Sequence, residues 1–349
     1  IENEILYVKT SLTDIIENKP YAYQLINGKR KTVPCKFKLK KNKVKFIFPE
    51  GYDKEYELII DPLLVFSTYS GASSDNFGFT ATYDTLGFTY GGGIVFGVGY
   101  PTTTGAYDAT FNGGSCDIAI SKYNANGSAL IYSTFIGGSN VEAPHSLVTN
   151  DAGELFILGT TGSSNYPTVT GSYDVGFGGG SFYNGTVLNY SSGSDIVITK
   201  LNNTGTVLLG STFVGGTGND GINYLSNLDY NYGDEFRGEI ILDNAGNCMV
   251  ASVTTSSNFP VSGGLSYRGG GNDAIVFKLN SGLTSLLWST HLGGSGNDAA
   301  YGLQTDGLGN VFVTGGTKST DIDFKTNLPL CNLSFSNDFL LQNWCGNVR

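Results

Sequence analysis

The only local group of acidic residues that could support hydrolysis lies in an insertion between predicted strands. Asp234, Glu235 and Glu239 follow one another closely there, with Asp229 just before them. Glycoside cleavage requires two carboxyl groups about 5–10 Å apart in a cleft. A polysaccharide-active enzyme that uses these acids is therefore one functional hypothesis. An exposed, solvated loop explains the same residues, and we favour this interpretation.

Other residue types typical of enzymes form no recognisable pattern. His145 and His291 each lie in or beside a predicted strand, and we interpret both as packed, hydrogen-bonded side chains. No Gly-x-Ser-x-Gly elbow occurs. The Gly-rich runs at 91–93, 178–180 and 269–271 lie between strands, whereas a phosphate site needs a following helix. We therefore predict that the protein is not an enzyme.

Two acidic turns offer oxygen ligands to a cation. They read Gly-Thr-Gly-Asn-Asp at 216–220 and Gly-Ser-Gly-Asn-Asp at 294–298, ending in Asp220 and Asp298. Calcium accepts carboxylates and backbone carbonyls in loops, so these two aspartates are candidate calcium ligands. The turns lack the alternating ligands and closing Glu of a dedicated calcium loop. We expect plain turns and no cofactor, with calcium as the alternative.

Aromatic and amide side chains are concentrated in two insertions, at 178–194 and 223–238. Long loops on a rigid scaffold commonly carry function. Amphipathic aromatic residues beside amides suit carbohydrate or protein recognition, and loop drift without function is the alternative. The candidate binding residues are Tyr183, Tyr190, Tyr224, Tyr230 and Tyr232.

These insertions connect the strands of a repeated unit. A Ser-Thr-aromatic strand, an Asp-to-Gly turn, an aromatic-Pro pair and an Asp-led strand ending in Lys recur in that order. The Asp-led strand occupies 117–122, 195–200 and 273–278 in successive copies. Its apolar residues lie on both faces, which predicts a sheet covered on both sides. Radially repeated four-stranded sheets form a β-propeller, and a β-helix is the structural alternative.

In such a blade, the connections that carry the two insertions emerge on the same side. We therefore expect both insertions to project from one face. The fold prediction is an all-β chain, with a small antiparallel β module at 1–61 and propeller repeats at 62–349. About four blades are visible, at 72–138, 139–216, 217–294 and 295–349.

The charge is unevenly distributed along the chain. Residues 1–63 carry 12 Lys and Arg against 9 Asp and Glu, whereas the rest carries 8 against 21. An acidic main body argues against nucleic-acid binding. The alternation of lysines with apolar residues at 36–46 predicts strands with one solvated face. No run of 18 apolar residues occurs, so we expect no membrane span. Because the sequence begins at Ile1 without Met, we expect a trimmed product of a longer chain.

Several segments together resemble the SBBP family of β-propeller repeats over residues 64–320. They are Gly-Asn-Val-Phe-Val-Thr-Gly-Gly-Thr at 309–317, Phe-Pro at 259–260 and Gly-Gly-Asn-Asp-Ala-Ile-Val-Phe-Lys-Leu-Asn at 270–280. Residues 1–63 resemble the β module that precedes those repeats. The resemblance implies a secreted or cell-surface protein of Bacteroidetes-type bacteria, linked to gliding motility or type IX secretion. It implies no shared catalytic residues.

The last 29 residues depart from the repeat pattern. A degenerate final strand is expected at 337–341, and the segment 64–70 could pair beside it and close a ring. The alternative is an open blade edge that supports assembly with partner strands. Our functional prediction is a non-catalytic extracellular or cell-surface propeller that binds a glycan or protein in adhesion. The alternatives are the polysaccharide-active enzyme and a structural spacer.

Overall fold

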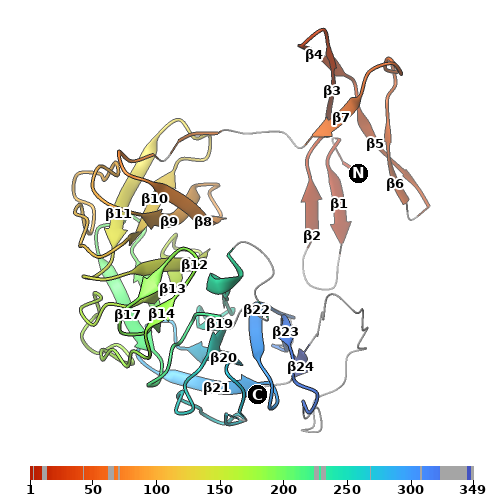
Figure 1. Cartoon of the computed structure of the whole chain (residues 1–349). Helices are drawn as coiled ribbons and strands as arrows, with labels where there is room; N and C mark the ends of the chain where they lie inside the picture. The colour runs from red at the N-terminus through yellow and green to blue at the C-terminus, as the bar shows by residue number, and fades with distance from the viewer. Residues whose placement is uncertain are drawn as a thin grey trace. The chain divides into compact units, whose positions relative to one another are not determined.

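The computed structural model describes most of the chain in two compact units, Ile1–Ser67 and Thr68–Arg349 (Figure 1). We refer to them as unit 1 and unit 2. The structure describes all residues except 3, 10–13, 42, 62–66, 70, 224–227, 229–232, 268, 307–308, 323–343 and 347–349.

Unit 1 consists of three small antiparallel sheets. The largest has the order β4-β3-β7, and two hairpins, β1–β2 and β5–β6, complete the unit. Gln24 is buried and ties down the loop before β7, because its Nε2 donates to Asp53 O at 2.6 Å and its Oε1 accepts from Asp53 N at 3.0 Å. The strands are β1 (Leu6–Lys9), β2 (Asp14–Glu17), β3 (Tyr21–Ile26), β4 (Lys29–Val33), β5 (Lys36–Lys40), β6 (Lys43–Ile47) and β7 (Leu58–Asp61).

The alternation predicted for residues 36–46 sets the pairing of β5 with β6. Lys38 lies opposite Lys45, and Phe37 lies opposite Phe46 with the two ring centroids 5.5 Å apart. Successive residues of a strand point to opposite faces, so lysines share one face of the hairpin and apolar residues the other.

The described part of unit 2 contains four larger antiparallel sheets in chain order, which we call blades 1 to 4, and a separate two-stranded sheet within the insertion of blade 2. Blades 1 to 3 have four strands each, and blade 4 has three described strands. The prediction of an all-β fold built from four-stranded antiparallel sheets is confirmed. The strands are β8 (Asn76–Tyr83), β9 (Thr89–Val95), β10 (Asp117–Tyr123) and β11 (Leu130–Ile136) in blade 1; β12 (Glu142–Thr149), β13 (Leu155–Thr161), β16 (Asp195–Leu201) and β17 (Leu208–Val214) in blade 2; β18 (Glu239–Leu242), β19 (Cys248–Thr254), β20 (Asp273–Leu279) and β21 (Leu286–Leu292) in blade 3; and β22 (Asp298–Thr305), β23 (Val311–Thr317) and β24 (Trp344–Gly346) in blade 4.

The Asp-led strands β10, β16 and β20 are buried on both faces, as their apolar pattern predicts. Ile198 of β16 belongs to a hydrophobic cluster with Phe277 of blade 3. Val197, which points to the other face of β16, belongs to a cluster with Ile120 of blade 1. Blade 2 is therefore packed between its two neighbours in sequence, which is the stacking expected of a propeller-like β fold.

The first strands of successive blades contact one another. β12 contacts β8 and β9 of blade 1, β18 contacts β12 and β13 of blade 2, and β22 contacts β18, β19 and β20 of blade 3. The first strands of blades 2, 3 and 4 therefore each pack against the preceding blade.

Each first strand is interrupted at one point. In blades 1, 2 and 4 a β-bulge there adds one residue to the first strand, namely Phe79, His145 or Tyr301, and the register shifts across it. In blade 3 the insertion 223–238 occupies the corresponding point. Asp220 lies before the insertion and bridges to Thr254, as Glu142 pairs with Thr161 and Asp298 with Thr317 in the other blades.

The Lys that ends each Asp-led strand forms an ion pair with the turn between the first and second strands. Lys200 Nζ lies 2.7 Å from Glu154 Oε2, and Lys278 Nζ lies 2.6 Å from Asp243 Oδ2. In blade 1, Lys122 and Asp84 are 3.5 Å apart and nearly buried. The acidic residue of the turn and the Lys that ends the Asp-led strand are two of the recurring sequence signals. They form ion pairs in the folded chain.

Most of the predicted ring closure lies outside the described residues, which include neither 62–66 and 70 nor 337–341. In the described part of the chain, no helix has the length and apolar character needed to cross a bilayer.

Candidate functional site

The two insertions meet on one side of unit 2. The first contains a hairpin of β14 (Tyr183–Asn184) and β15 (Asn189–Tyr190), and the second contains the 3-10 helix η1 (Asp234–Phe236). Thr186 joins them, because its N and Oγ1 donate to Glu235 Oε1 at 3.1 and 2.8 Å. These contacts confirm that both insertions share a face. We call residues 181–192 and 233–238 the insertion platform.

The bulges direct side chains from the other blades to the insertion platform. The ring centroid of Phe236 lies 6.2 Å from that of Phe79 and 6.2 Å from that of His145. The Arg237 guanidinium lies 5.9 Å from the Tyr301 ring centroid. A bulge bends its strand and re-aims a side chain. Blades 1, 2 and 4 therefore all support the platform through their bulge residues.

Tyr183 and Tyr190 anchor the platform instead of facing solvent. They lie opposite each other in the hairpin and are buried with Ile94 and Leu188. The Tyr190 hydroxyl lies 3.1 Å from Thr160 Oγ1, which lies 3.2 Å from His145 Nε2. The expectation that these two tyrosines are displayed for binding is wrong, because their register turns both toward the core. Tyr224, Tyr230 and Tyr232 lie outside the described residues.

The hairpin displays a different set of side chains. Because side chains alternate along a strand, the partners Asn184 and Asn189 face outward where Tyr183 and Tyr190 face inward. Phe182 is 59% exposed and Val187 at the turn is 37% exposed. The exposed side chains of the hairpin thus include one aromatic ring, one aliphatic group and two amides. Ser181, Thr186, Ser191 and Ser192 add hydroxyl groups, and Arg237 is exposed on the second insertion.

The acidic residues of the second insertion form structural contacts. Asp234 and Glu235 are buried, so the expectation of a solvated acidic loop is wrong for them. Asp234 Oδ1 lies 2.6 Å from Arg237 Nε, and Glu235 accepts the two bonds from Thr186. Burial raises the pKa of Glu239 in β18. Asp234 and Glu235 thus hold the platform in place, whereas Glu239 lies in the strand that follows it. Asp229 lies outside the described residues.

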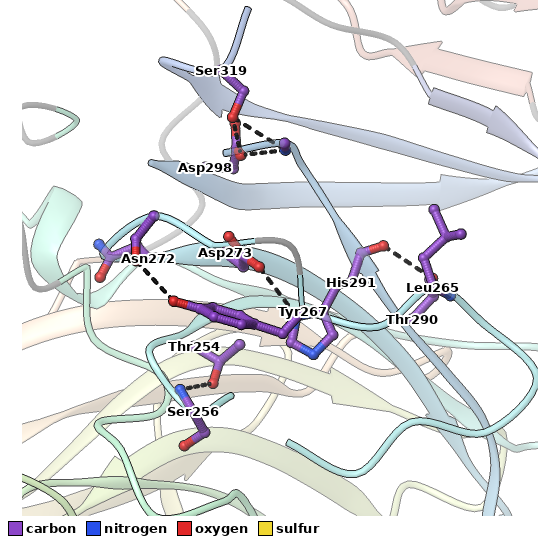
Figure 2. A network of polar contacts seen from close by, with 12 residues as sticks. Thr254, Ser256, Leu265, Tyr267, Asn272, Asp273, Thr290, His291, Asp298 and Ser319 are labelled. Carbon is purple, nitrogen blue, oxygen red and sulfur yellow. Dashed lines mark hydrogen bonds and ion pairs between the residues drawn. The ribbon is translucent and has the colours of Figure 1, made fainter. Parts of the chain in front are cut away.

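Both histidines are packed, as predicted. The predicted hydrogen bond is present for His145, through Thr160, but neither ring nitrogen of His291 has a hydrogen-bond partner among the described residues. Burial lowers the pKa of His145 to about 3, so its imidazole is neutral at physiological pH. His291 lies between Phe259 and Tyr267, with ring centroids 6.1 and 5.9 Å away. Its Nδ1 is 3.6 Å from Asp273 Oδ2, and Figure 2 shows this pair beside Tyr267.

The two candidate calcium ligands accept hydrogen bonds from their own blades. Asp220 accepts from Thr254 Oγ1, from Gly216 N at 2.7 Å and from Ser256 Oγ at 2.9 Å. Asp298 accepts from Gly294 N at 2.9 Å and from Ser319 Oγ at 2.6 Å (Figure 2). These contacts fix the preceding turns. The described residues include no group of three or more His, Cys, Asp or Glu placed to hold a metal ion, and calcium binding stays a prediction.

A shallow hollow of about 160 Å³ lies on blade 1. Its lining includes Phe77, Tyr100, Ser121 and the backbone of 91–93. The Tyr100 hydroxyl already pairs with Ser121 Oγ at 2.6 Å, and ligand pockets usually measure about 300–1,000 Å³. The insertion platform is therefore the stronger candidate for a functional site.

Sequence reasoning missed the bulge residues and Phe182. A bulge breaks the alternation on which strand assignment depends, so Phe79 and Tyr301 gave no signal of their own, and His145 was recognised as a packed side chain but not as a bulge residue. One signal was available: the second strands carry Gly93, Gly159 and Gly315 at the same point, and glycine inside a strand often marks a bulge.

Two family models match parts of the chain. A domain of unknown function (DUF7948) matches residues 1–63, and the SBBP beta-propeller repeat matches residues 287–323. The second match covers one repeat at the boundary of blades 3 and 4. No curated protein matches the sequence significantly.

Two solved structures are similar to the chain at low identity. A protein of unknown function from Dyadobacter fermentans DSM 18053 is 9% identical, with a TM-score of 0.38; the match covers 73% of this chain and 65% of that one. Rhamnogalacturonan lyase YesW is 14% identical, with a TM-score of 0.36; the match covers 90% of this chain and 57% of that one. The chain thus spans less than two thirds of either protein.

Proposed function

We propose that unit 2 is a non-catalytic binding module that recognises a glycan or a protein partner through the insertion platform. The observation that carries this proposal is the joining of two insertions from different blades by the bonds between Thr186 and Glu235. A loop held in place before binding loses little conformational entropy when the ligand arrives.

The exposed residues of the platform suit such a ligand. An exposed aromatic ring can stack on the apolar face of a sugar or on a partner side chain, and flanking amides can exchange hydrogen bonds with hydroxyl or peptide groups. Phe182, Asn184 and Asn189 supply these groups within one hairpin. Adhesion outside the cell fits the low charged content of 14% and the propeller repeat.

The test is a binding screen with paired variants. Wild-type protein is applied to a glycan array and to the surface proteins of a Bacteroidetes host, and hits are quantified by calorimetry. The double variant Phe182→Ala with Asn184→Ala should weaken each hit at least about tenfold, because an aromatic anchor commonly contributes 1.4 kcal/mol or more. The melting temperature should remain nearly unchanged because both side chains are exposed.

Tyr83 provides the matched control, since it is an aromatic residue of blade 1 that is 75% exposed. Tyr83→Ala should bind like wild type. If the platform variant binds as tightly as the wild-type protein, the platform is not the recognition surface. If wild-type protein binds nothing in either screen, a spacer role replaces the binding role.

A further inference from the structure

Pairs of buried carboxyl groups stand where neighbouring blades meet. One member opens the third strand of a blade and the other precedes or opens the first strand of the next blade. All six side chains are at most 2% exposed. The pairs are Asp117 with Glu142, Asp195 with Asp220, and Asp273 with Asp298.

The first pair differs from the second in its hydrogen bonds. A methyl carbon on Gly137 would lie 2.6 Å from Asp117 Oδ1 and 2.9 Å from Glu142 Oε2, so the two oxygens flank one point. Asp117 Oδ1 has no hydrogen-bond donor among the described residues, and Glu142 Oε2 has none at full hydrogen-bond geometry, although Ser163 and the Gly138 backbone also approach the Glu142 carboxyl and oppose the rise in its pKa. Their sister oxygens are satisfied, because Asp117 Oδ2 accepts from Asn112 N at 2.6 Å and Glu142 Oε1 accepts from Thr161 Oγ1 at 2.6 Å.

The second pair shows what a fully bonded junction looks like. Asp195 accepts from Gly178 N at 2.6 Å and from Gly179 N at 3.0 Å, one bond on each oxygen. Both oxygens of Asp220 also have donors, from Thr254, Gly216 and Ser256. All four carboxyl oxygens of this junction are therefore satisfied by N–H and O–H groups.

The chain's own repeat suggests why the first junction differs. Blades 3 and 4 carry Asp220 and Asp298 at the position where blade 2 carries Glu142. Glu142 is one methylene longer than these aspartates, and its carboxyl reaches that of Asp117, so that Asp117 Oδ1 and Glu142 Oε2 lie on either side of one point. Two buried acceptors so arranged require either a proton or a cation between them.

We propose that Asp117 and Glu142 hold a single proton between them at neutral pH, so that a carboxylic acid of one blade donates a hydrogen bond to a carboxylate of the next, or the reverse. One proton satisfies both orphan oxygens and leaves the junction with a single negative charge. Protonated carboxyl pairs of this kind arise when two acids are too close to ionise together.

The surroundings favour the proton over a cation. Calcium needs six to eight oxygen ligands, and no group of three or more ligating side chains occurs in the described part of the chain. Nearby ionisable groups are Asp108, Cys116, Tyr166 and Tyr190, and none supplies a positive charge. Burial raises the pKa of Asp117 to about 8, with the Glu142 charge adding to the shift against the Asn112 N–H, and burial also raises the pKa of Glu142.

Counting the protons released on unfolding tests this proposal. Both acids ionise at neutral pH once the chain unfolds, so the pair should release one proton. In Glu142→Gln the amide N–H₂ can replace the shared proton, so weakly buffered unfolding at pH 7 should release one proton fewer per chain than wild type. Asp117→Asn should give the same loss, and the infrared band of a buried protonated carboxyl should weaken in both variants.

The exposed turn residue Asp151 provides the control, because Asp151→Asn should release as many protons as wild type. Circular dichroism establishes that each variant is folded. Equal proton release by wild type and both junction variants would overturn the proposal. So would a wild-type protein whose melting temperature falls on addition of a chelator, when Glu142→Gln is insensitive, because a cation would then occupy the junction.

Discussion

Glycine lies opposite the bulge in three of the four blades, and close backbone approach is the reason. A methyl carbon would lie 2.2 Å from Phe77 O at Gly93, 2.6 Å from Ala143 O at Gly159 and 1.9 Å from Ala299 O at Gly315. Backbone atoms cannot move aside as the end of a flexible side chain can. These glycines therefore permit the bulges that aim Phe79, His145 and Tyr301 at the insertion platform.

Substitution at one of these glycines should destabilise unit 2. We expect Gly159→Ala to lower the free energy of unfolding by about 1–3 kcal/mol, the usual range for overpacking a core. Urea denaturation followed by circular dichroism measures the change. Blade 3 provides the control, because Ser252 occupies the same position, and among the described residues it faces no bulge and its buried hydroxyl has no hydrogen-bond partner. Ser252→Ala should be neutral or slightly stabilising, and an equal loss in both variants would contradict the close-approach argument.

The sequence predicted which residue types gather near the site better than which way they point. Tyr183 and Tyr190 were visible as unusual loop aromatics. Their burial depends on which residues of β14 and β15 lie opposite each other, and composition does not determine that pairing. A shift of one residue would exchange Tyr183 with Phe182 and Asn184 on the outer face.

The β14–β15 hairpin is held to blade 2 by a chain of three polar side chains. Tyr190 contacts Thr160, and Thr160 contacts His145, all of them buried. Because the His145 imidazole is neutral, the chain contains no charge, and each member depends on the next for its hydrogen bonds. The hairpin is too short to be stable without such an anchor.

Removing one hydroxyl should loosen this element. Tyr190→Phe leaves Thr160 with one partner fewer in the core, so we expect a loss of about 1–3 kcal/mol and faster amide exchange within 181–192. Tyr132 provides the control, since its buried hydroxyl has no hydrogen-bond partner among the described residues. Tyr132→Phe should leave stability unchanged or slightly raised. Equal amide exchange in the two variants would show that Tyr190 does not anchor the hairpin.

At the element scale, the regular strands could be predicted and the irregular ones could not. The Asp-led strands have residues of fixed type at both ends, because Asp stands at a blade junction and Lys pairs with a turn acid. The matching turns 216–220 and 294–298 relate Asp220 to Asp298 in the sequence. The equivalence of Asp220 to Glu142 was hidden, because the insertion separates Asp220 from β18. The junction pairs therefore became visible only when the strands were aligned in space.

Because buried carboxyls lie at several blade junctions, we expect the stability of the whole of unit 2 to depend on pH. Burial raises the pKa of Asp220 to about 8 and of Asp195 to about 7, and it also raises the pKa of Asp117, which titrates together with Glu142; the hydrogen bonds that each carboxyl receives oppose these shifts. Unfolded aspartate has a pKa of about 3.9. The folded state thus binds more protons than the unfolded state between about pH 4 and pH 8. The resulting stability is fully present below pH 4 and is lost as the pH rises through 7 and 8.

We therefore expect the free energy of unfolding to fall steadily from pH 6.5 to pH 8.5, with an initial slope of up to about 1.4 kcal/mol per pH unit for each protonated carboxyl. His145 acts in the opposite direction at the lower edge of this window, because its unfolded imidazole has a pKa of about 6.5 and is mostly neutral only above about pH 7.5. Urea titrations at pH 6.5, 7.5 and 8.5 measure the slope. Asp117→Asn should reduce the slope by about the contribution of one carboxyl. A free energy of unfolding that is constant or rises across this window would mean that the junction carboxyls are ionised in the folded chain. The blades would then pack together despite the repulsion between those charges.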